Sequence, residues 1–225
     1  MNKHAQAGVT LISLLVGLVI AMICIIAVLT TYRVVVKTGT ESRIAANHDT
    51  QLQMGLTNAQ MLLQNAGFGL DGTTHLVTSV NITAQVNSAS QTISNAVLWR
   101  FQGNNGVTCQ GLADIKNADN TQRQLVLLSG ITTGSTLCDS TTNLTALKWQ
   151  VQSSLANLRD YSSDQSNPAQ ITWQKTNAAC TPYGAGKLDE STQHVVIKIS
   201  SKTSTQQSAN LSPVEVSVCL VNISV

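Results

Sequence analysis

The chain has 225 residues, of which 11% are charged and 4% are aromatic, and its formal net charge is +2. This length allows one anchoring helix and one domain of about 150 residues. A basic surplus this small argues against nucleic-acid binding by bulk electrostatics. The short apolar runs that recur along the polar part argue against a disordered chain.

An uncharged apolar run lies near the amino terminus. It extends from Val9 to Leu29, and its 21 residues would span roughly 31 Å as a helix, about one bilayer core. The pair Ala7–Gly8 stands just before the run. A secretory signal has its small-residue cleavage site after the apolar run, so the order is reversed here. Cleavage after Gly8 would remove a leader of residues 1–8 and leave the helix on the mature chain.

The residues at this junction read Gly8-Val9-Thr10-Leu11-Ile12-Ser13-Leu14, and they resemble the type IV prepilin signal. That signal has a short basic leader ending in Gly, then an apolar residue that is usually Phe or Met, then Thr-Leu-Ile-Glu-Leu. The chain departs from it at Val9 and at Ser13. The resemblance implies that a membrane prepilin peptidase cuts after Gly8 and methylates the new amino terminus on Val9. The alternative is a plain single-pass anchor with a glycine at its edge.

Helical spacing continues after the apolar run. An apolar stripe recurs at intervals of three and four residues, on Ile44, His48, Leu52, Leu56, Ala59, Leu63 and Ala66. We expect a helix from Val9 to Ala66 with a transmembrane half (9–30), and an amphipathic half within 31–67 that stops at Gly67. Gly39 and Gly55 should weaken this helix and mark bends. His48 is interpreted as a partly buried structural residue.

Beyond Leu70 the apolar period changes from about four to two, which predicts strands. The candidate strands are residues 76–82, 96–101, 125–128, 144–152, 170–174, 195–200 and 214–223. An antiparallel sheet with one solvated face needs a cover for its apolar face, and the helix over 44–66 is the obvious partner. The sequence therefore predicts an α+β fold, in which the long N-terminal helix packs on an antiparallel β-sheet domain of residues 68–225. This is the architecture of the pilin fold.

Four of the five cysteines lie in the polar part, at Cys109, Cys138, Cys180 and Cys219. They have no metal-ligand spacing, so we expect no metal and interpret them as two disulfides in an exported domain. Three pairings are open. We favour Cys109–Cys138 and Cys180–Cys219, because sequence neighbours need the least loop closure. By the positive-inside rule, the basic residues that follow the apolar run would place the carboxyl domain in the cytoplasm. The cysteines and the prepilin-like signal indicate export instead, and we base the orientation on these two signals.

Catalytic patterns are missing from the sequence. It has no nucleophile elbow or triad signature, so we expect no enzymatic activity and no cofactor. The acids, Asp114 among them, fall in predicted loops, where a solvated role is the default. We expect no cation site at Asp160 and Asp164.

Two later segments resemble the PilW-type minor pilins: Leu62-Leu63-Gln64-Asn65-Ala66-Gly67-Phe68-Gly69, and Val97–Phe101 with Cys109-Gln110-Gly111. The resemblance implies a minor pilin, a structural and initiating subunit of a type IV pilus. Its expected partners are other minor pilins, the major pilin, the prepilin peptidase and the inner membrane. We expect a single-pass inner-membrane chain with a periplasmic carboxyl domain, which also reaches the pilus filament at the cell surface.

Ser13 adds an expectation about position in the filament. In the pilin family a Glu occupies this place and pairs with the amino terminus of a neighbouring subunit. Ser13 has no charge for that pairing, which favours a place at the filament tip or in the initiating complex. The alternative is that serine is merely tolerated there and hydrophobic packing alone docks the subunit. The alternatives left open are a pseudopilin of a type II secretion system and a membrane-anchored periplasmic binding domain that never polymerises.

Overall fold

The computed structural model describes residues 10–117, 122–131, 138–161, 167–181, 193–223 and 225. The chain divides into two compact units, Met1–Ala45 and Ala46–Val225. Helix α1 (Leu11–Leu63) begins in the first unit and ends in the second. Over the described residues the predicted long helix is therefore confirmed.

The end of α1 differs by three residues from the prediction. The N–H groups of Asn65 and Ala66 donate to carbonyls three residues back, so the chain leaves the α-helix in tight turns. Gly67 follows with a φ of +74°. A Cβ there would lie 2.5 Å from the carbonyl oxygen of Asn222. Both the left-handed backbone and the close approach require glycine at this position.

The described strands all belong to the second unit, and they follow α1 in the chain. They are β1 (Leu76–Val86), β2 (Ala89–Gly103), β3 (Gly106–Lys116), β4 (Arg123–Gly130), β5 (Trp149–Leu158), β6 (Ile171–Ala178), β7 (His194–Ser201) and β8 (Val214–Leu220). A short helix, α2 (Ser204–Ser208), lies between β7 and β8.

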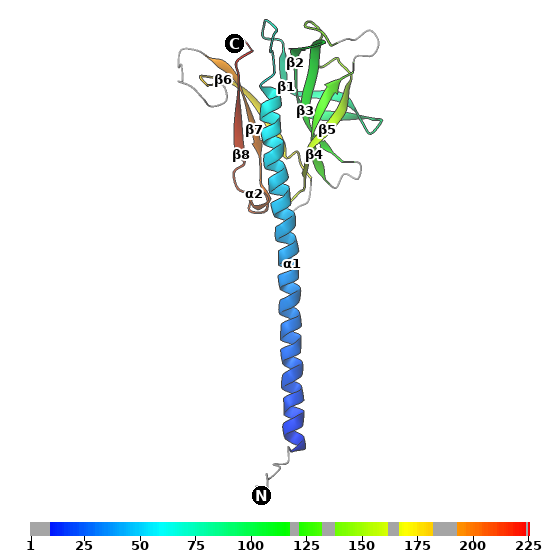
Figure 1. Cartoon of the computed structure of the whole chain (residues 1–225), viewed down its shortest axis with the longest axis vertical. Helices are drawn as coiled ribbons and strands as arrows, with labels where there is room; N and C mark the ends of the chain where they lie inside the picture. The colour runs from blue at the N-terminus through cyan, green and yellow to red at the C-terminus, as the bar shows by residue number, and fades with distance from the viewer. Residues whose placement is uncertain (1–9, 118–121, 132–137, 162–166, 182–192, 224) are drawn as a thin grey trace. The chain divides into compact units, whose positions relative to one another are not determined.

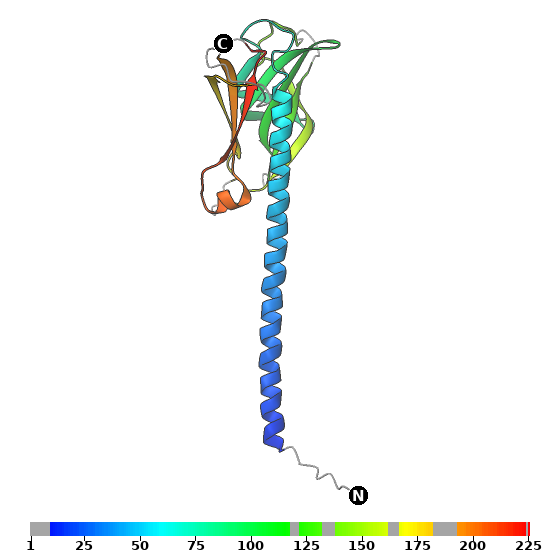
Figure 2. The same cartoon turned by 60° about the vertical axis from the view of Figure 1, so that its left-hand side comes forward.

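These strands form two sheets, whereas the sequence pattern predicted one. Strands β1 to β5 close into a barrel, and the closing contact is a short parallel pairing of Ala84 with Trp149 and of Gln85 with Gln150. Strands β6, β7 and β8 form a separate antiparallel sheet. The carboxyl part of α1 lies between the barrel and this sheet (Figures 1 and 2).

The second unit has two apolar cores because several barrel strands are buried on both faces. In β2, Val97 and Trp99 face α1, while Ala96 and Leu98 face the barrel interior. The core around α1 also takes side chains from the inner face of the β6–β7–β8 sheet. The expected covering of the sheets by the helix is therefore present, but the barrel has an interior of its own.

Candidate functional site

The first unit presents an apolar helical surface. From Leu11 to Val36 its large hydrophobic side chains are between 45% and 78% exposed. The helix is long and apolar enough to cross a membrane, and none of its most apolar stretch is buried within the chain. Exposed apolar area of this extent is unfavourable in water, so lipid or the helices of other chains must cover it.

Ser13 lies in the first turns of this helix. The neighbouring side chains Ile12 and Leu14 are exposed, and the N–H of Leu14 donates to the Thr10 carbonyl at 3.2 Å. The first turn of α1 contains no acidic side chain. The expected cleavage and methylation positions, Gly8 and Val9, lie outside the described residues.

In the second unit, Asp49 joins α1 to the start of α2. Its carboxylate accepts hydrogen bonds from the Ser204 N–H at 2.7 Å and from the Ser204 hydroxyl at 2.8 Å. The third partner is Nδ1 of His48, at 3.0 Å. Burial acts to raise the pKa of Asp49, but these hydrogen bonds outweigh it and hold that pKa below its ordinary value. The cluster of His48, Asp49 and Ser204, called the clasp below, fastens α2 to α1.

The order of the groups in the clasp does not fit nucleophilic catalysis. Asp49 stands between the imidazole and the serine hydroxyl, whereas a catalytic triad needs the imidazole against the nucleophile. His48 is 4% exposed, and its ring meets the Tyr161 ring edge-on at 5.1 Å between centroids. His48 is thus more deeply buried than the partly buried position expected for it. Sequence reasoning missed Asp49 and Ser204, which are 155 positions apart.

One local signal for this region was present in the sequence. Thr203 accepts from the N–H of Gln206, and the Gln206 side chain accepts from the N–H of Thr203 at 2.9 Å. This reciprocal pair is a capping box, and the spacing of Thr203 and Gln206 could have placed the start of α2.

The structure contains the disulfides Cys109–Cys138 and Cys180–Cys219, which are the two pairs favoured from the sequence. Cys24, the fifth cysteine, is free and exposed on α1. Arg100, which is 2% exposed, donates to the carbonyls of Asp139 and Thr142 beside the first disulfide. The bridge and this guanidinium both hold the 138–142 segment on the barrel.

The structure corrects the expectation for the position of Asp114. It was assigned to a loop with a solvated role, but it lies in β3 and is 5% exposed. Arg123 donates to its carboxylate at 2.7 Å, and the backbone N–H groups of Gln170 and Ile171 donate at 2.6 and 3.1 Å. Burial raises the pKa of Asp114, although Arg123 and the two N–H groups act against that rise. The carboxylate therefore links the barrel to the start of β6.

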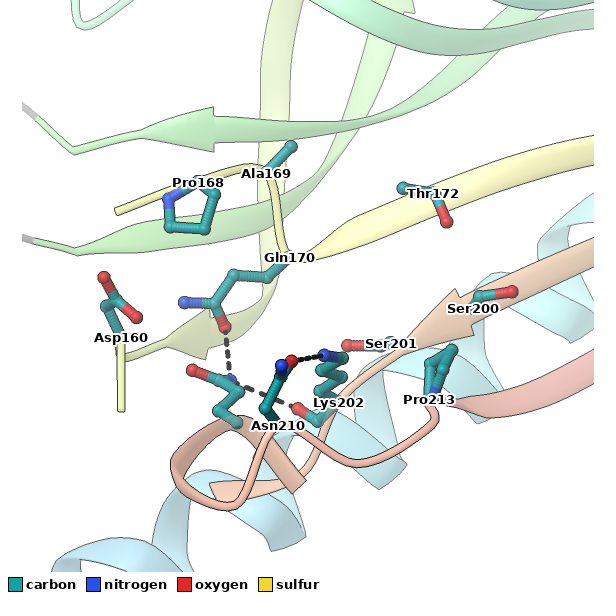
Figure 3. A pocket seen from close by; sticks show the side chains of 11 residues that line it. Asp160, Pro168, Ala169, Gln170, Thr172, Ser200, Ser201, Lys202, Asn210 and Pro213 are labelled. Carbon is teal, nitrogen blue, oxygen red and sulfur yellow. Dashed lines mark hydrogen bonds between the residues drawn. The ribbon is translucent and has the colours of Figure 1, made fainter. Parts of the chain in front are cut away.

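A cleft of about 410 Å³ opens between the start of β6, the end of β7 and the segment after α2 (Figure 3). The Lys202 ammonium donates to Asn210 at 3.1 Å. The Gln207 amide donates to the side chain of Gln170 at 3.0 Å and to the Lys202 carbonyl at 3.2 Å. These polar groups bond to one another across the cleft and do not converge on a common point, as catalytic groups would.

No family model, no curated protein and no solved structure matches the chain. Within the described residues there is also no group of three or more His, Cys, Asp or Glu placed to hold a metal ion.

Proposed function

We propose that the chain is a minor pilin, a structural and initiating subunit of a type IV pilus. The observation that carries the proposal is the exposed apolar surface from Leu11 to Val36, on a helix whose other end forms the core of a folded domain. A membrane can cover this surface before assembly, and the helices of other subunits can cover it within a filament. The prepilin-like residues at Gly8 and Val9 support the same reading.

The second unit fits a role outside the cytoplasm. Its two disulfides suit an oxidising compartment. Asp49 accepts hydrogen bonds from Ser204, and Lys202 donates to Asn210, which agrees with a structural role for these side chains.

Ser13 supports a place at the tip of the filament. A carboxylate within a membrane costs at least about 2.5–3.5 kcal/mol on insertion scales, so it is kept there only for a function. Ser13 avoids that cost and cannot neutralise the amino terminus of a subunit ahead of it. A subunit at the tip has none ahead of it to neutralise. Antibody labelling of intact filaments against the second unit should mark ends only, and label spaced along the shaft would contradict the tip position.

Processing gives the first test of the function. Intact-mass analysis of the chain from its native membrane should show a mature protein that begins at N-methylated Val9. A chain that keeps residues 1–8 in a host with an active prepilin peptidase would contradict the proposal, and would favour the membrane-anchored binding domain.

Deletion of the gene gives the second test. Loss of surface filaments with normal protein secretion is the expected result. Loss of secretion with normal filaments would instead identify a pseudopilin of a type II secretion system.

A further inference from the structure

The apolar run of α1 ends in residues that suit a membrane boundary. Thr30 and Thr31 follow Leu29, and their hydroxyls donate to the Ala27 carbonyl at 2.8 and 2.9 Å. These hydroxyls need no partner outside the helix, so they can lie in hydrocarbon. Tyr32 comes next and is 65% exposed. Tyrosine is enriched where a membrane meets water, because its ring is apolar and its hydroxyl is polar.

A basic segment, residues 33–43, follows this boundary. It contains Arg33, Lys37 and Arg43 against a single acid, Glu41. The Lys37 ammonium lies 3.9 Å from the Glu41 carboxylate, but the two side chains are 76% and 65% exposed, and an ion pair as exposed as this is weak. Within the described parts of the chain, Arg33 and Arg43 have no ion pair or side-chain hydrogen bond. The segment therefore has positive charge that its own side chains leave largely uncompensated.

The helical rise sets the depth of each basic side chain. Residues 11–31 span roughly 31 Å, which is about the thickness of one bilayer core. Arg33 then lies at the level of the headgroups, and Lys37 lies about 6 Å further along the helix. Arg43 lies about 15 Å beyond Arg33, outside the headgroup layer. Because residues four positions apart share one face of a helix, Arg33 and Lys37 point in the same direction.

Three valines between these two basic residues keep this part of the helix apolar. Val34, Val35 and Val36 are 64%, 63% and 45% exposed. With them the apolar surface is longer than a bilayer core, and a helix of such length tilts so that its end stays near the hydrocarbon. The long Arg33 and Lys37 side chains can extend from there to the headgroups, as basic side chains at membrane boundaries do.

We propose that Arg33 and Lys37 bind the anionic headgroups of phospholipids at the carboxyl end of the membrane-spanning segment. Charge complementarity selects this occupant, because a zwitterionic headgroup has no net charge, whereas an anionic one is attracted by each basic side chain near the surface. The inference rests on the proposed function only in that α1 spans a membrane, and it does not require assembly into a filament. It also gives a role to basic residues that the positive-inside rule would not place on the exported side.

Lipid nanodiscs with one copy of the full chain test the inference. The discs contain equal amounts of phosphatidylglycerol and phosphatidylcholine with the same acyl chains. Native mass spectrometry of the released chain counts the lipids that it retains, and the measured quantity is the ratio of phosphatidylglycerol to phosphatidylcholine. Because each disc contains one copy, a neighbouring subunit cannot be the partner of the basic residues.

In the wild type we expect more phosphatidylglycerol than phosphatidylcholine among the retained lipids. Arg33→Gln and Lys37→Gln should each lower the ratio roughly fivefold, which is the effect of removing one charge near the surface. Arg33→Lys keeps the charge and should keep the ratio. Arg43→Gln is the matched control, because it removes the same charge from the same helix beyond the headgroups, and it should leave the ratio unchanged. All three side chains are exposed, so the fold should not change, and tryptophan fluorescence of the second unit checks this.

Three results would overturn the inference. These are a wild-type ratio near one, an unchanged ratio in either Arg33→Gln or Lys37→Gln, and an equal fall in Arg43→Gln, which would indicate net charge without a binding surface. Processing after Gly8 tests the proposed function separately. A chain that keeps residues 1–8 in its native host but prefers phosphatidylglycerol would contradict the minor pilin alone. A correctly processed chain without this preference would contradict the lipid inference alone.

Discussion

Gly55 allows a sharp test of the packing between α1 and the barrel. A Cβ at this position would lie 2.8 Å from the Cβ of Ala156 and 3.3 Å from Cδ2 of Leu125. Non-bonded carbon atoms pack at about 3.5–4.0 Å. The Ala156 Cβ is fixed to the backbone of β5, so it cannot rotate away, and in Gly55→Ala the helix and the strand must separate. The glycine expected to mark a bend thus marks a close contact.

Two effects of opposite sign determine the stability of Gly55→Ala. Alanine favours a helix over glycine by about 1 kcal/mol, whereas overpacking a core costs about 1–3 kcal/mol. The clash joins two carbons fixed to their backbones, so the upper half of that range applies. We therefore expect a net loss of about 1–2 kcal/mol, which lowers the Tm of a domain of this size by roughly 2–8 °C.

Thermal unfolding of the full chain in detergent, followed by tryptophan fluorescence, would measure this loss. The three tryptophans all lie buried in the second unit, at Trp99, Trp149 and Trp173. Gly39→Ala is the control, because an added Cβ at Gly39 meets nothing within 4 Å.

A second variant shows whether the loss comes from the clash. In an Ala156→Gly background the opposing Cβ is gone, so Gly55→Ala should lower the Tm by less than it does in the wild type. A Gly55→Ala chain whose Tm equals or exceeds that of the wild type would refute the reasoning.

Three further predictions concern other positions. Arg123→Ala should lower the free energy of unfolding by roughly 3–5 kcal/mol, because Asp114 would remain buried without its partner; chemical denaturation measures this, and a loss below 1 kcal/mol would contradict it. Asp49→Ala should speed amide exchange at Ser204 with little change in Tm. In the wild type the same loosening should appear as the pH falls below about 4, because a carboxylate with a lowered pKa loses its stabilising effect on protonation; Ser204 exchange that does not change at low pH would oppose this. Ser13→Glu should raise the share of this subunit in purified filaments, measured by quantitative mass spectrometry, and an unchanged share would show that Ser13 does not determine position.

Much of the secondary structure follows from the sequence, because its signals are local. The uncharged run after Gly8 and the stripe through Leu52 and Leu63 predicted α1 to within a few residues. The missed strand, β3, contains Gly106 and Gly111, which weaken a strand pattern. In the structure a Cβ at Gly111 would meet the side chain of Leu98 at 2.7 Å, so this glycine allows two strands to approach. Such a requirement becomes visible only when both strands are placed.

Closure of the barrel could not be predicted in the same way. It depends on the parallel pairing of Ala84 with Trp149, which no local pattern signals. The expected strand over 144–152 begins instead at Trp149, because Leu144 and Leu147 lie in turns and fill the barrel interior. In the sequence, apolar residues of a turn that fill the barrel interior look the same as apolar residues of a strand. The clasp was missed for the same reason, since Asp49 and Ser204 meet only through the tertiary fold.

The barrel and the three-stranded sheet differ in how much their apolar cores depend on α1. The barrel interior contains no side chain from α1, whereas the second core places Leu52, Leu56 and Leu63 between the barrel and the β6–β7–β8 sheet. The barrel thus has an apolar core independent of the helix, while the three-stranded sheet buries its inner face in the core that contains α1. Asp114 and the clasp attach this sheet at the end next to α2, and the Gln60 side chain and the Cys180–Cys219 disulfide attach it at β8. The three-stranded sheet is therefore the part of the second unit that depends most on neighbouring elements.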